Sequence, residues 1–302
     1  DYFHKTTSDL LYPTAAIQPA AAQAVITWDN LDGKIINKGF EAAVNATIIQ
    51  QKNFSWDLGV NATFLKNNVT GMDAPIYTGQ LNGQGVSGTL VEIIYNDMPI
   101  NGFWTREYGG MDKDGQSIYP NGERLTYQGT PNPSTLLGIS TTLAYKKLTL
   151  TANLNGAFGH KIYNNTFNNV VNINNLLAGR NVAEEFFNAP IQESLANRVT
   201  SSSRYLESGN YLKLANTTLS YAVGDIGHFV KGLNVYFTGQ NLFVITKFKG
   251  FDPEVNVDKS SGAPGADSKT GMSTSGGVPS AGIEYQPYPS ARTFTLGVNF
   301  SL

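Results

Sequence analysis

The stretch MDKDGQSIY contains the residues best suited to bind a metal ion, because it places Asp112 and Asp114 two positions apart and follows them with Gly115. Carboxylate oxygens at this spacing, beside a glycine that permits a tight turn, make up half of a calcium-binding loop of the EF-hand type. A plain Asp-Gly turn produces the same pattern without any ion. We therefore interpret this stretch as an ordinary turn without a metal ion, with Asp112 and Asp114 as the candidate ligands if calcium is bound.

Two further patterns have the residue types of binding sites but lack the right surroundings. The stretch GQGVSG at 83–88 fits the glycine pattern of dinucleotide-binding loops, but the strand-like TLVEIIY follows it where that motif needs a helix. The histidines are far apart and form no H-E-x-x-H pattern: they are His4, His160 and His228. We expect them near strand ends rather than around a metal ion.

Catalytic patterns are also missing from the sequence. It contains no G-x-S-x-G nucleophile elbow, and Glu184 and Glu185 lie in a helical loop segment, NVAEEFFNAP, without a partner base. Asp252 and Glu254 are close, but Pro253 between them indicates a turn. We therefore predict that the protein is not an enzyme and requires no cofactor.

Aromatic residues are the stronger indication of ligand binding. Several lie in or near long polar segments, where flat rings could stack on sugars or on peptide side chains: Trp28, Tyr77, Trp104, Tyr108, Tyr119 and Tyr127. Of these, Trp104, Tyr108 and Tyr119 are the candidate substrate-binding residues. For Trp104 an aromatic girdle at a membrane interface is an equal alternative, and Trp56 and Tyr145 are assigned to such a girdle.

The composition limits the kind of protein that positions these residues. The chain has 302 residues and is 41% hydrophobic but only 15% charged, where roughly 25% is typical. Its 30 asparagines outnumber its 21 lysines and arginines together. The net charge of −2 gives no reason to expect nucleic acid. The chain has no cysteine and no run of about 18 apolar residues, so disulfides and a transmembrane helix are excluded.

Apolar residues recur at every second position through much of the chain, which predicts β-strands with two different faces. Residues 40–48 and 54–64 alternate in this way, and a turn at 51–53 would pair Ile48 with Trp56, Val44 with Val60 and Phe40 with Phe64. A two-residue turn at Lys146-Lys147 would likewise pair Tyr145 with Leu148 and Leu143 with Leu150. The last stretch, ARTFTLGVNFSL, alternates up to its final residue.

The pattern predicts about ten strands, near 1–12, 34–50, 54–69, 88–98, 102–110, 134–146, 148–162, 205–223, 232–247 and 291–302. Their connections alternate in length: those at 51–53, 99–101, 146–147 and 224–231 are short, and those at 13–33, 70–87, 111–133, 163–204 and 248–290 are long. Short turns on one side and long loops on the other are typical of outer-membrane barrels. A β-sandwich also alternates, but its connections do not separate by side.

The predicted fold is therefore all-β, an antiparallel transmembrane β-barrel. The polar strand faces are rich in Asn, Thr and Ser, so N-x-[ST] sequons recur there as neighbours on one strand face. We interpret these faces as a wet lumen wall and the apolar faces as lipid-facing. A last strand that runs to the chain end would then close the barrel, because no open edge is tolerated in hydrocarbon.

Several long stretches resemble SusC/RagA-like TonB-dependent outer-membrane transporters. They include RYLESGNYLKLANTTLSYAV (204–223), GLNVYFTGQNLFVITKFKGFDPEV (232–255) and YPSARTFTLGVNFSL (288–302). The stretches DYFHKTTSDLL and GTPNPSTLLGISTTLAYKKLTLTANLNGAFGHKIYN are also similar to that family. The chain departs from the family at its last residue, where Leu302 stands in place of the usual aromatic.

The resemblance implies an outer-membrane importer of oligosaccharides or peptides in a Gram-negative bacterium, energised by TonB and working with a SusD-like surface lipoprotein. Residues 1–302 would form roughly the C-terminal half of the barrel, without the plug or the TonB-contacting segment. The remaining partners would be the N-terminal part of the same transporter and membrane lipid, with long loops extracellular and the C-terminus periplasmic. A passive porin and a soluble β-rich surface binding module are the alternatives.

Overall fold

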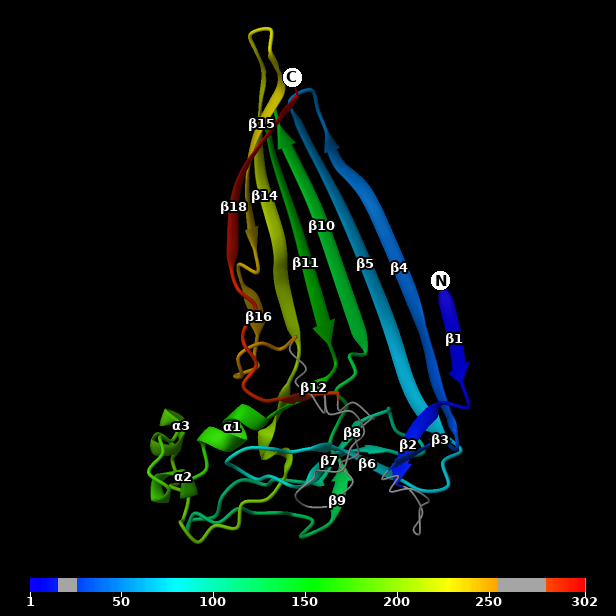
Figure 1. The fold of residues 1–302 in the computed structure, drawn as a ribbon, viewed down its shortest axis with the longest axis vertical. Coiled ribbons are helices and arrows are strands. Elements are labelled where there is room, and N and C mark those ends of the chain that lie inside the picture. The colour runs from blue at the N-terminus through cyan, green and yellow to red at the C-terminus, as the bar shows by residue number, and fades with distance from the viewer. Residues whose placement is uncertain (16–25, 255–280, 302) are drawn as a thin grey trace.

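The computed structural model describes residues 1–15, 26–254 and 281–301. Its largest element is a single antiparallel sheet, which we call the wall, with strand order β1-β4-β5-β10-β11-β14-β15-β18 and with β16 paired to β14. The remaining described elements form a separate group at one end of the wall, which we call the head (Figure 1). The wall strands are β1 (Tyr2–Thr7), β4 (Lys34–Gln50), β5 (Phe54–Thr70), β10 (Thr135–Tyr145), β11 (Leu148–Phe158), β14 (Tyr211–Ile226), β15 (Val230–Gln240), β16 (Val244–Thr246) and β18 (Thr293–Ser301).

The wall has one apolar and one polar face, as the alternation predicts. Strand register aligns an apolar row across six strands: Trp56, Leu143, Leu150, Leu219, Phe237 and Leu296. One position away on the same six strands, and therefore on the other face, register aligns Asp57, Thr142, Thr151, Thr218, Thr238 and Thr295, and Thr47 of β4 pairs with Asp57 at the end of this row. Large apolar side chains of the first face are solvent-exposed in the isolated chain, which is the pattern of a lipid-facing barrel surface.

Both predicted hairpins form, and one contains an unexpected bulge. Tyr145 pairs with Leu148 and Leu143 with Leu150, as predicted. In the β4–β5 hairpin the predicted pairs of Val44 with Val60 and of Phe40 with Phe64 are confirmed. The predicted pair of Ile48 with Trp56 is wrong, because the register shifts between Thr47 and Ile49 and Ile49 becomes the partner of Trp56.

The connections of the wall separate by length. Short turns at 51–53, 146–147 and 227–229 lie at the end of the wall far from the head (Figure 1). The connections at 8–33, 71–134, 159–210 and 241–292 are long, and their described parts carry the small sheets and helices of the head and, in the last of them, the wall strand β16. The separation of short turns from long loops is therefore observed, with the exception of the predicted turn at 99–101.

The strands predicted at 88–98 and 102–110 lie in the head and not in the wall. They form β7 (Leu90–Ile94) and β8 (Gly102–Arg106), which belong to a four-stranded sheet with β6 (Ile76–Gln80) and β9 (Leu125–Tyr127). Each of the two has only five residues, whereas a membrane-spanning strand needs about 9–11. Four of the five residues of β7 are buried, so the strand packs on both faces instead of separating lipid from water.

Four predicted strands are interrupted, three of them where the chain passes between the wall and the head and one between two strands of the wall. The strand at 1–12 divides into β1 and β2 (Leu11–Ala15), and that at 148–162 divides into β11 and β12 (Lys161–Asn164). The strand at 205–223 divides into β13 (Leu206–Ser208) and β14, and that at 232–247 into β15 and β16. Left-handed residues mark three of these breaks, namely Asp9 (φ 55), Gly159 (φ 81) and Asn241 (φ 53).

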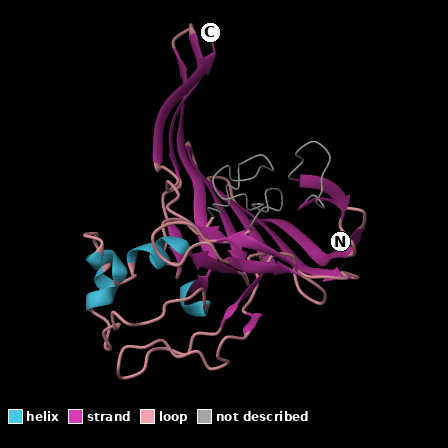
Figure 2. Cartoon of the chain, turned by 60° about the horizontal axis from the view of Figure 1, so that its bottom comes forward, coloured by secondary structure: helices cyan, strands magenta, loops and turns pink. Residues whose placement is uncertain are grey.

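The predicted helical segment is confirmed as α3 (Glu184–Phe187), and two further short helices precede it, α1 (Asn165–Val170) and α2 (Asn174–Leu177). The three helices gather on one side of the head, as Figure 2 shows. The other described head elements are β3 (Ile26–Asn30), which pairs with β2, the 3₁₀ turn η2 (Ser203–Tyr205), and β17 (Ile283–Glu284), which pairs with β12. Within the described residues, no helix is long and apolar enough to cross a membrane.

The buried core lies mainly in the head and at its junction with the wall. One cluster joins residues of the helices and the small sheets: Leu81, Val91, Phe103, Tyr163, Val171, Ile173, Phe186, Tyr205 and Ile283. A second cluster, at the head end of β4 and β5, contains Leu31, Ile35, Val69, Met72 and Ile94. These clusters give the head a packed interior that can fix the positions of loop side chains.

Candidate ligand-contacting site in the head

The glycine-rich stretch at 83–88 is a loop clamped by asparagines of α1. The Asn169 side-chain oxygen accepts hydrogen bonds from the backbone N–H groups of Gln84 and Gly85, and the Asn168 amide exchanges hydrogen bonds with the backbone of Val86. A Cβ atom added to Gly85 would collide with the backbone of Asn168. Glycine is therefore required here by the close approach of a helix, and the loop does not open a dinucleotide-binding helix.

The Asp112 carboxylate stabilises its own turn. Its Oδ1 accepts hydrogen bonds from the backbone N–H groups of Asp114 at 2.9 Å and of Gln116 at 2.8 Å, an arrangement that matches an Asx turn. The Asp114 residue is exposed. Among the described residues there is no group of three or more His, Asp or Glu side chains that could hold a metal ion.

The same loop brings two of the predicted aromatic candidates together. After β8 ends at Arg106, the chain folds back on itself, with backbone hydrogen bonds from Gly109 to Ile118 (2.8 Å) and from Ile118 to Gly110 (2.9 Å). The Tyr108 and Tyr119 rings then meet edge to face, with centroids 6.4 Å apart. The Arg106 guanidinium lies over the Tyr119 ring, 5.8 Å from its centroid. Both rings are partly exposed.

A second arginine, Arg204, packs against this cluster on its buried side. The Arg204 guanidinium lies 5.6 Å from the Tyr108 centroid and 5.7 Å from the Tyr205 centroid. It also pairs with the Glu193 carboxylate at 2.8 Å. The two chain segments are connected by a hydrogen bond from the Tyr108 backbone N–H to the Ser203 hydroxyl (2.9 Å). We call the resulting series Arg106, Tyr119, Tyr108, Arg204 and Tyr205 the Tyr–Arg ladder.

Burial and charge fix the protonation states in the ladder. Burial raises the pKa of the Tyr108 hydroxyl, although the positive charge of Arg204 opposes the shift. Burial also raises the pKa of Tyr205 far above its usual value. For Arg204, burial alone would lower the pKa, but the hydrogen bond and charge of Glu193 outweigh it and the pKa rises. At neutral pH Tyr108 and Tyr205 are therefore neutral phenols, and Arg204 keeps its positive charge.

The remaining aromatic candidates lie elsewhere in the head. Trp104 lies in β8 opposite Tyr127 in β9, so it belongs to the head sheet and to none of the apolar rows of the wall. Tyr77 lies in β6, and the backbone of Trp28 is part of β3. Trp56 and Tyr145 lie in the wall beside the short turns, as predicted. Sequence reasoning missed Arg204 and Glu193, because the contact that brings them to the aromatic loop joins Arg204 to Tyr108, more than ninety positions earlier in the chain.

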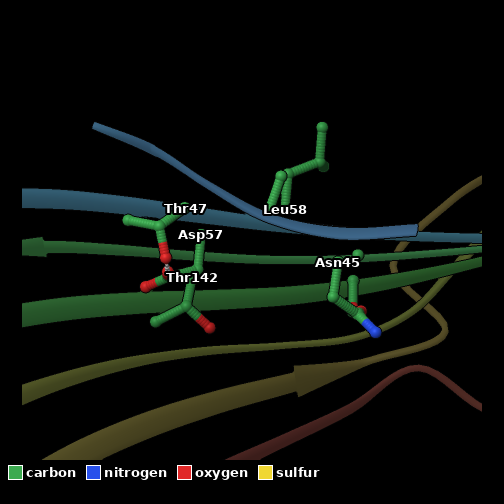
Figure 3. Close-up of a pocket in the computed structure, with 8 residues that line it drawn as sticks. Asn45, Thr47, Asp57, Leu58 and Thr142 are labelled. Atoms are coloured by element: carbon green, nitrogen blue, oxygen red, sulfur yellow. Dashed lines mark hydrogen bonds between the residues drawn. The ribbon is translucent and has the colours of Figure 1, made fainter. Parts of the chain in front are cut away.

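Two hollows accompany these clusters. One of about 370 Å³ lies where the head meets the wall, lined by Tyr127, Gly129, Thr130, Gly159, His160, Lys161, Leu206, Glu207, Ser208 and Asn210. The His160 side chain is buried there, and burial lowers its pKa. The second hollow, of about 250 Å³, lies on the polar face of the wall between β4, β5 and β10. Figure 3 shows Asn45, Thr47, Asp57 and Thr142 on one side of the sheet and Leu58 on the other.

At the second hollow, polar side chains lie on one face of the wall and an apolar side chain lies on the other. The Thr47 hydroxyl donates a hydrogen bond of 2.6 Å to the Asp57 carboxylate. Gly59 leaves space between the side chains of Asn45 and Ser140, which a Cβ atom would otherwise fill. Small polar side chains thus line this part of the wall, while Leu58 points away from them. A wall with one apolar and one polar face, and with its long connections at one end, is the wall of a transmembrane β-barrel.

Comparison with known proteins defines the class of this barrel. No family model matches the chain. It is 25% identical to TonB-dependent receptor P3 of Formosa agariphila and 26% identical to TonB-dependent receptor SusC of Bacteroides thetaiotaomicron. Both matches cover 99% of this chain, but only 32% and 29% of the respective relatives. The chain thus spans about a third of the length of these relatives.

Solved structures share the fold. The chain matches the RagAB peptide importer in its open-open state with a TM-score of 0.72 and 21% identity, over 100% of this chain and 32% of that one. A second RagAB structure, described as a peptide transporter, matches with a TM-score of 0.71 and 20% identity, over 100% and 33% of the two chains. The fold is therefore that of a TonB-dependent transporter barrel. Within that class the chain is SusC-like, as its sequence indicates, and the relatives are receptors and transporters rather than enzymes.

Proposed function

We propose that this chain is the C-terminal portion of the barrel of an outer-membrane active importer of nutrients. The observation that carries the proposal is the two-faced wall, whose short turns lie at one end and whose long connections leave the strands toward the other end (Figure 1). In the proposed orientation this end, with the head, is extracellular, and the short turns and the C-terminus are periplasmic. The plug and the segment that contacts TonB would belong to other parts of the same transporter.

The head offers a surface for a SusD-like surface lipoprotein that would close the barrel. Leu177 and Phe187 are 71% and 57% exposed, although each is a large apolar residue on a short helix. Leu195 and Ile191, in the segment after α3, are exposed as well. The helices that carry Leu177 and Phe187 lie on one side of the head (Figure 2), and exposed apolar residues on one surface are typical of protein-binding sites. These residues belong to the long loop predicted at 163–204. The other long loop that we propose as a contact for the lipoprotein, at 248–290, lies largely outside the described residues.

The cargo would be an oligosaccharide or a peptide, and the Tyr–Arg ladder is the proposed contact. Partly exposed tyrosine rings bind the faces of sugars and the side chains of peptides, and adjacent guanidinium groups fix polar substituents. Trp104, Tyr108 and Tyr119 remain the proposed substrate-binding residues. Asp112 and Asp114 remain proposed only as a calcium site that would stabilise this loop from outside.

Energy dependence tests the proposal against its alternative, a passive porin. Cells that carry the full-length transporter should lose cargo uptake when the proton gradient is collapsed, because a plugged channel opens only when work is supplied from the inner membrane. Deletion of the lipoprotein partner should weaken capture, most of all at low cargo concentration. Purified transporter in liposomes should not pass cargo by itself. Free passage without an energy source would establish the porin and refute active import.

A further inference from the structure

The two arginines of the Tyr–Arg ladder have very different counter-ions. Arg204 forms a short ion pair of 2.8 Å with Glu193, and the two side chains are 13% and 2% exposed. Arg106 lies 3.5 Å from Glu123, whose side chain is 91% exposed while that of Arg106 is 25% exposed. The inner pair is therefore a fixed structural contact. The outer pair is long and reaches into solvent, where an ion pair contributes little.

The neighbours of Arg106 leave its charge available. Glu123 lies on an exposed turn beside Gly122, which adopts a left-handed conformation (φ 59). The carboxylate of the next residue in the chain, Glu107, accepts a hydrogen bond of 2.7 Å from the Asn121 side chain. One face of the Arg106 guanidinium lies over the Tyr119 ring. The aromatic ring holds the planar group in place without using its N–H donors.

We propose that Arg106, held against Tyr119, binds a carboxylate group of the ligand and that Glu123 is the resident counter-ion which this carboxylate displaces. Guanidinium groups bind carboxylates through two parallel hydrogen bonds, which a single contact of 3.5 Å to an exposed side chain does not provide. A carboxylate binds more strongly to a half-buried, preoriented arginine than to a fully exposed one. The proposal rests on the importer function, since the ligand is the cargo of the same site.

The ligand class is thus a carboxylate-bearing molecule. The group could be supplied by an acidic sugar of an oligosaccharide or by the C-terminus of a peptide, since both present the same two oxygen atoms. Tyr119 and Tyr108 beside Arg106 would pack against the apolar part of either one. Neutral oligosaccharides and peptide amides lack the group that Arg106 recognises.

Binding to the purified full-length transporter tests this directly. Calorimetry compares an acidic and a neutral probe of each source: trigalacturonate with maltotriose, and trialanine with trialanine amide. Arg106→Gln should weaken binding of the acidic probe by at least about tenfold, and Glu123→Gln should tighten it. Arg124→Gln, at an exposed arginine on the same turn, is the matched control. It should leave binding of the acidic probe unchanged. Binding of the neutral probes should be equal in all variants.

The proposal is overturned if wild-type protein prefers neither acidic probe, or if Arg106→Gln and Arg124→Gln bind alike. The probe that responds to Arg106 identifies the source of the carboxylate. A thermal unfolding measurement on each variant separates loss of the site from loss of the fold. Binding to purified protein needs no proton gradient, so this result is independent of whether import is active or passive.

Discussion

Leu296 and Thr295 are adjacent in β18, but they belong to opposite faces of the wall. Leu296 is 74% exposed and aligns with Phe237 in the apolar row, whereas Thr295 aligns with Thr238 in the polar row. We expect Leu296→Arg to destabilise the full-length barrel by roughly 2–4 kcal/mol if the residue lies near the bilayer midplane, because it places a cation in lipid. Thr295→Arg should be tolerated. Urea unfolding of both variants in phospholipid vesicles measures the difference.

An equal effect of the two substitutions would contradict the assignment of faces, and with it the membrane interpretation. The comparison is internally controlled, since both variants add the same side chain to neighbouring positions of one strand. A general disturbance of β18 would affect both equally. The two substitutions should have different effects only if one side of the sheet faces lipid and the other faces water.

His160 predicts a dependence of head stability on pH. Burial holds its pKa below the ordinary value of 6.5, so the unfolded head binds the proton more readily than the folded head. The stability that the head gains from neutral His160 is therefore fully present above the pKa of this histidine in the unfolded state. It is lost as the pH falls below that value. Between about pH 7.5 and pH 5.5, the wild-type head should become more susceptible to protease, and His160→Gln should reduce that change.

His228 supplies the control for this prediction, since it is exposed in the turn between β14 and β15. His228→Gln should leave the pH profile of proteolysis as it is in the wild type. If His160→Gln and wild type respond to acid in parallel, another group is responsible. Lys161 and Glu207, which line the same hollow, would then be examined next.

For individual residues, the sequence indicated the partly exposed members of the Tyr–Arg ladder, Tyr108 and Tyr119. It did not indicate the buried members. Tyr108 and Tyr119 were identifiable because they are aromatic residues in a polar loop, only eleven positions apart. Arg204 meets Tyr108 through contacts that span about ninety residues of chain, and no local pattern encodes such a contact. The only local indication was that Arg204 stands next to Tyr205 at the start of a strand-like stretch. A charged residue in that position is too common to specify a site.

Strand register was predictable where local geometry determines it. A two-residue turn and strict alternation leave only one pairing for β10 with β11, and that pairing is observed. The β4–β5 bulge was not predictable, because an extra residue changes the register without changing the alternation on either side. The β7 and β8 strands were recognisable as strands, but periodicity alone does not say which sheet a strand joins. Their predicted ranges, 88–98 and 102–110, are long enough to span a membrane, so only the structure shows that both strands end early.

The helices of the head provide a prediction at the scale of elements. Replacing Leu177 and Phe187 together by serine should weaken co-purification of the SusD-like lipoprotein with the full-length transporter, because the exposed apolar surface is lost. The main core of the head would remain, since Phe186, and not Phe187, belongs to the buried cluster. Co-purification is quantified against the amount of transporter recovered from the membrane.

Phe229 is a suitable control for the helix variant. It is 82% exposed and lies at the short turn between β14 and β15, at the opposite end of the wall (Figure 1). Phe229→Ser removes an exposed aromatic ring without altering the head, so partner recovery should equal that of the wild type. Equal losses from both variants would mean that the helices are not the docking surface.

The whole molecule has a feature that no single strand reveals, namely an open sheet. The described strand order begins with β1 and ends with β18, and neither has a second neighbour in the wall. Both edges present unpaired backbone N–H and C=O groups, and one face of the sheet is apolar. The buried clusters lie in the head and at the junction, so they do not cover these edges.

We therefore expect residues 1–302 produced alone to aggregate, because edge pairing and the exposed apolar face favour association between copies. Co-production with the N-terminal part of the same transporter should instead yield a folded barrel, since the additional strands would pair with β1 and β18. Size-exclusion chromatography in plain buffer and in detergent, together with the heat-dependent mobility of folded barrels on gels, distinguishes the two states. A monodisperse, folded product of residues 1–302 in plain buffer would show that this sheet is complete by itself, and the barrel assignment would then have to be abandoned.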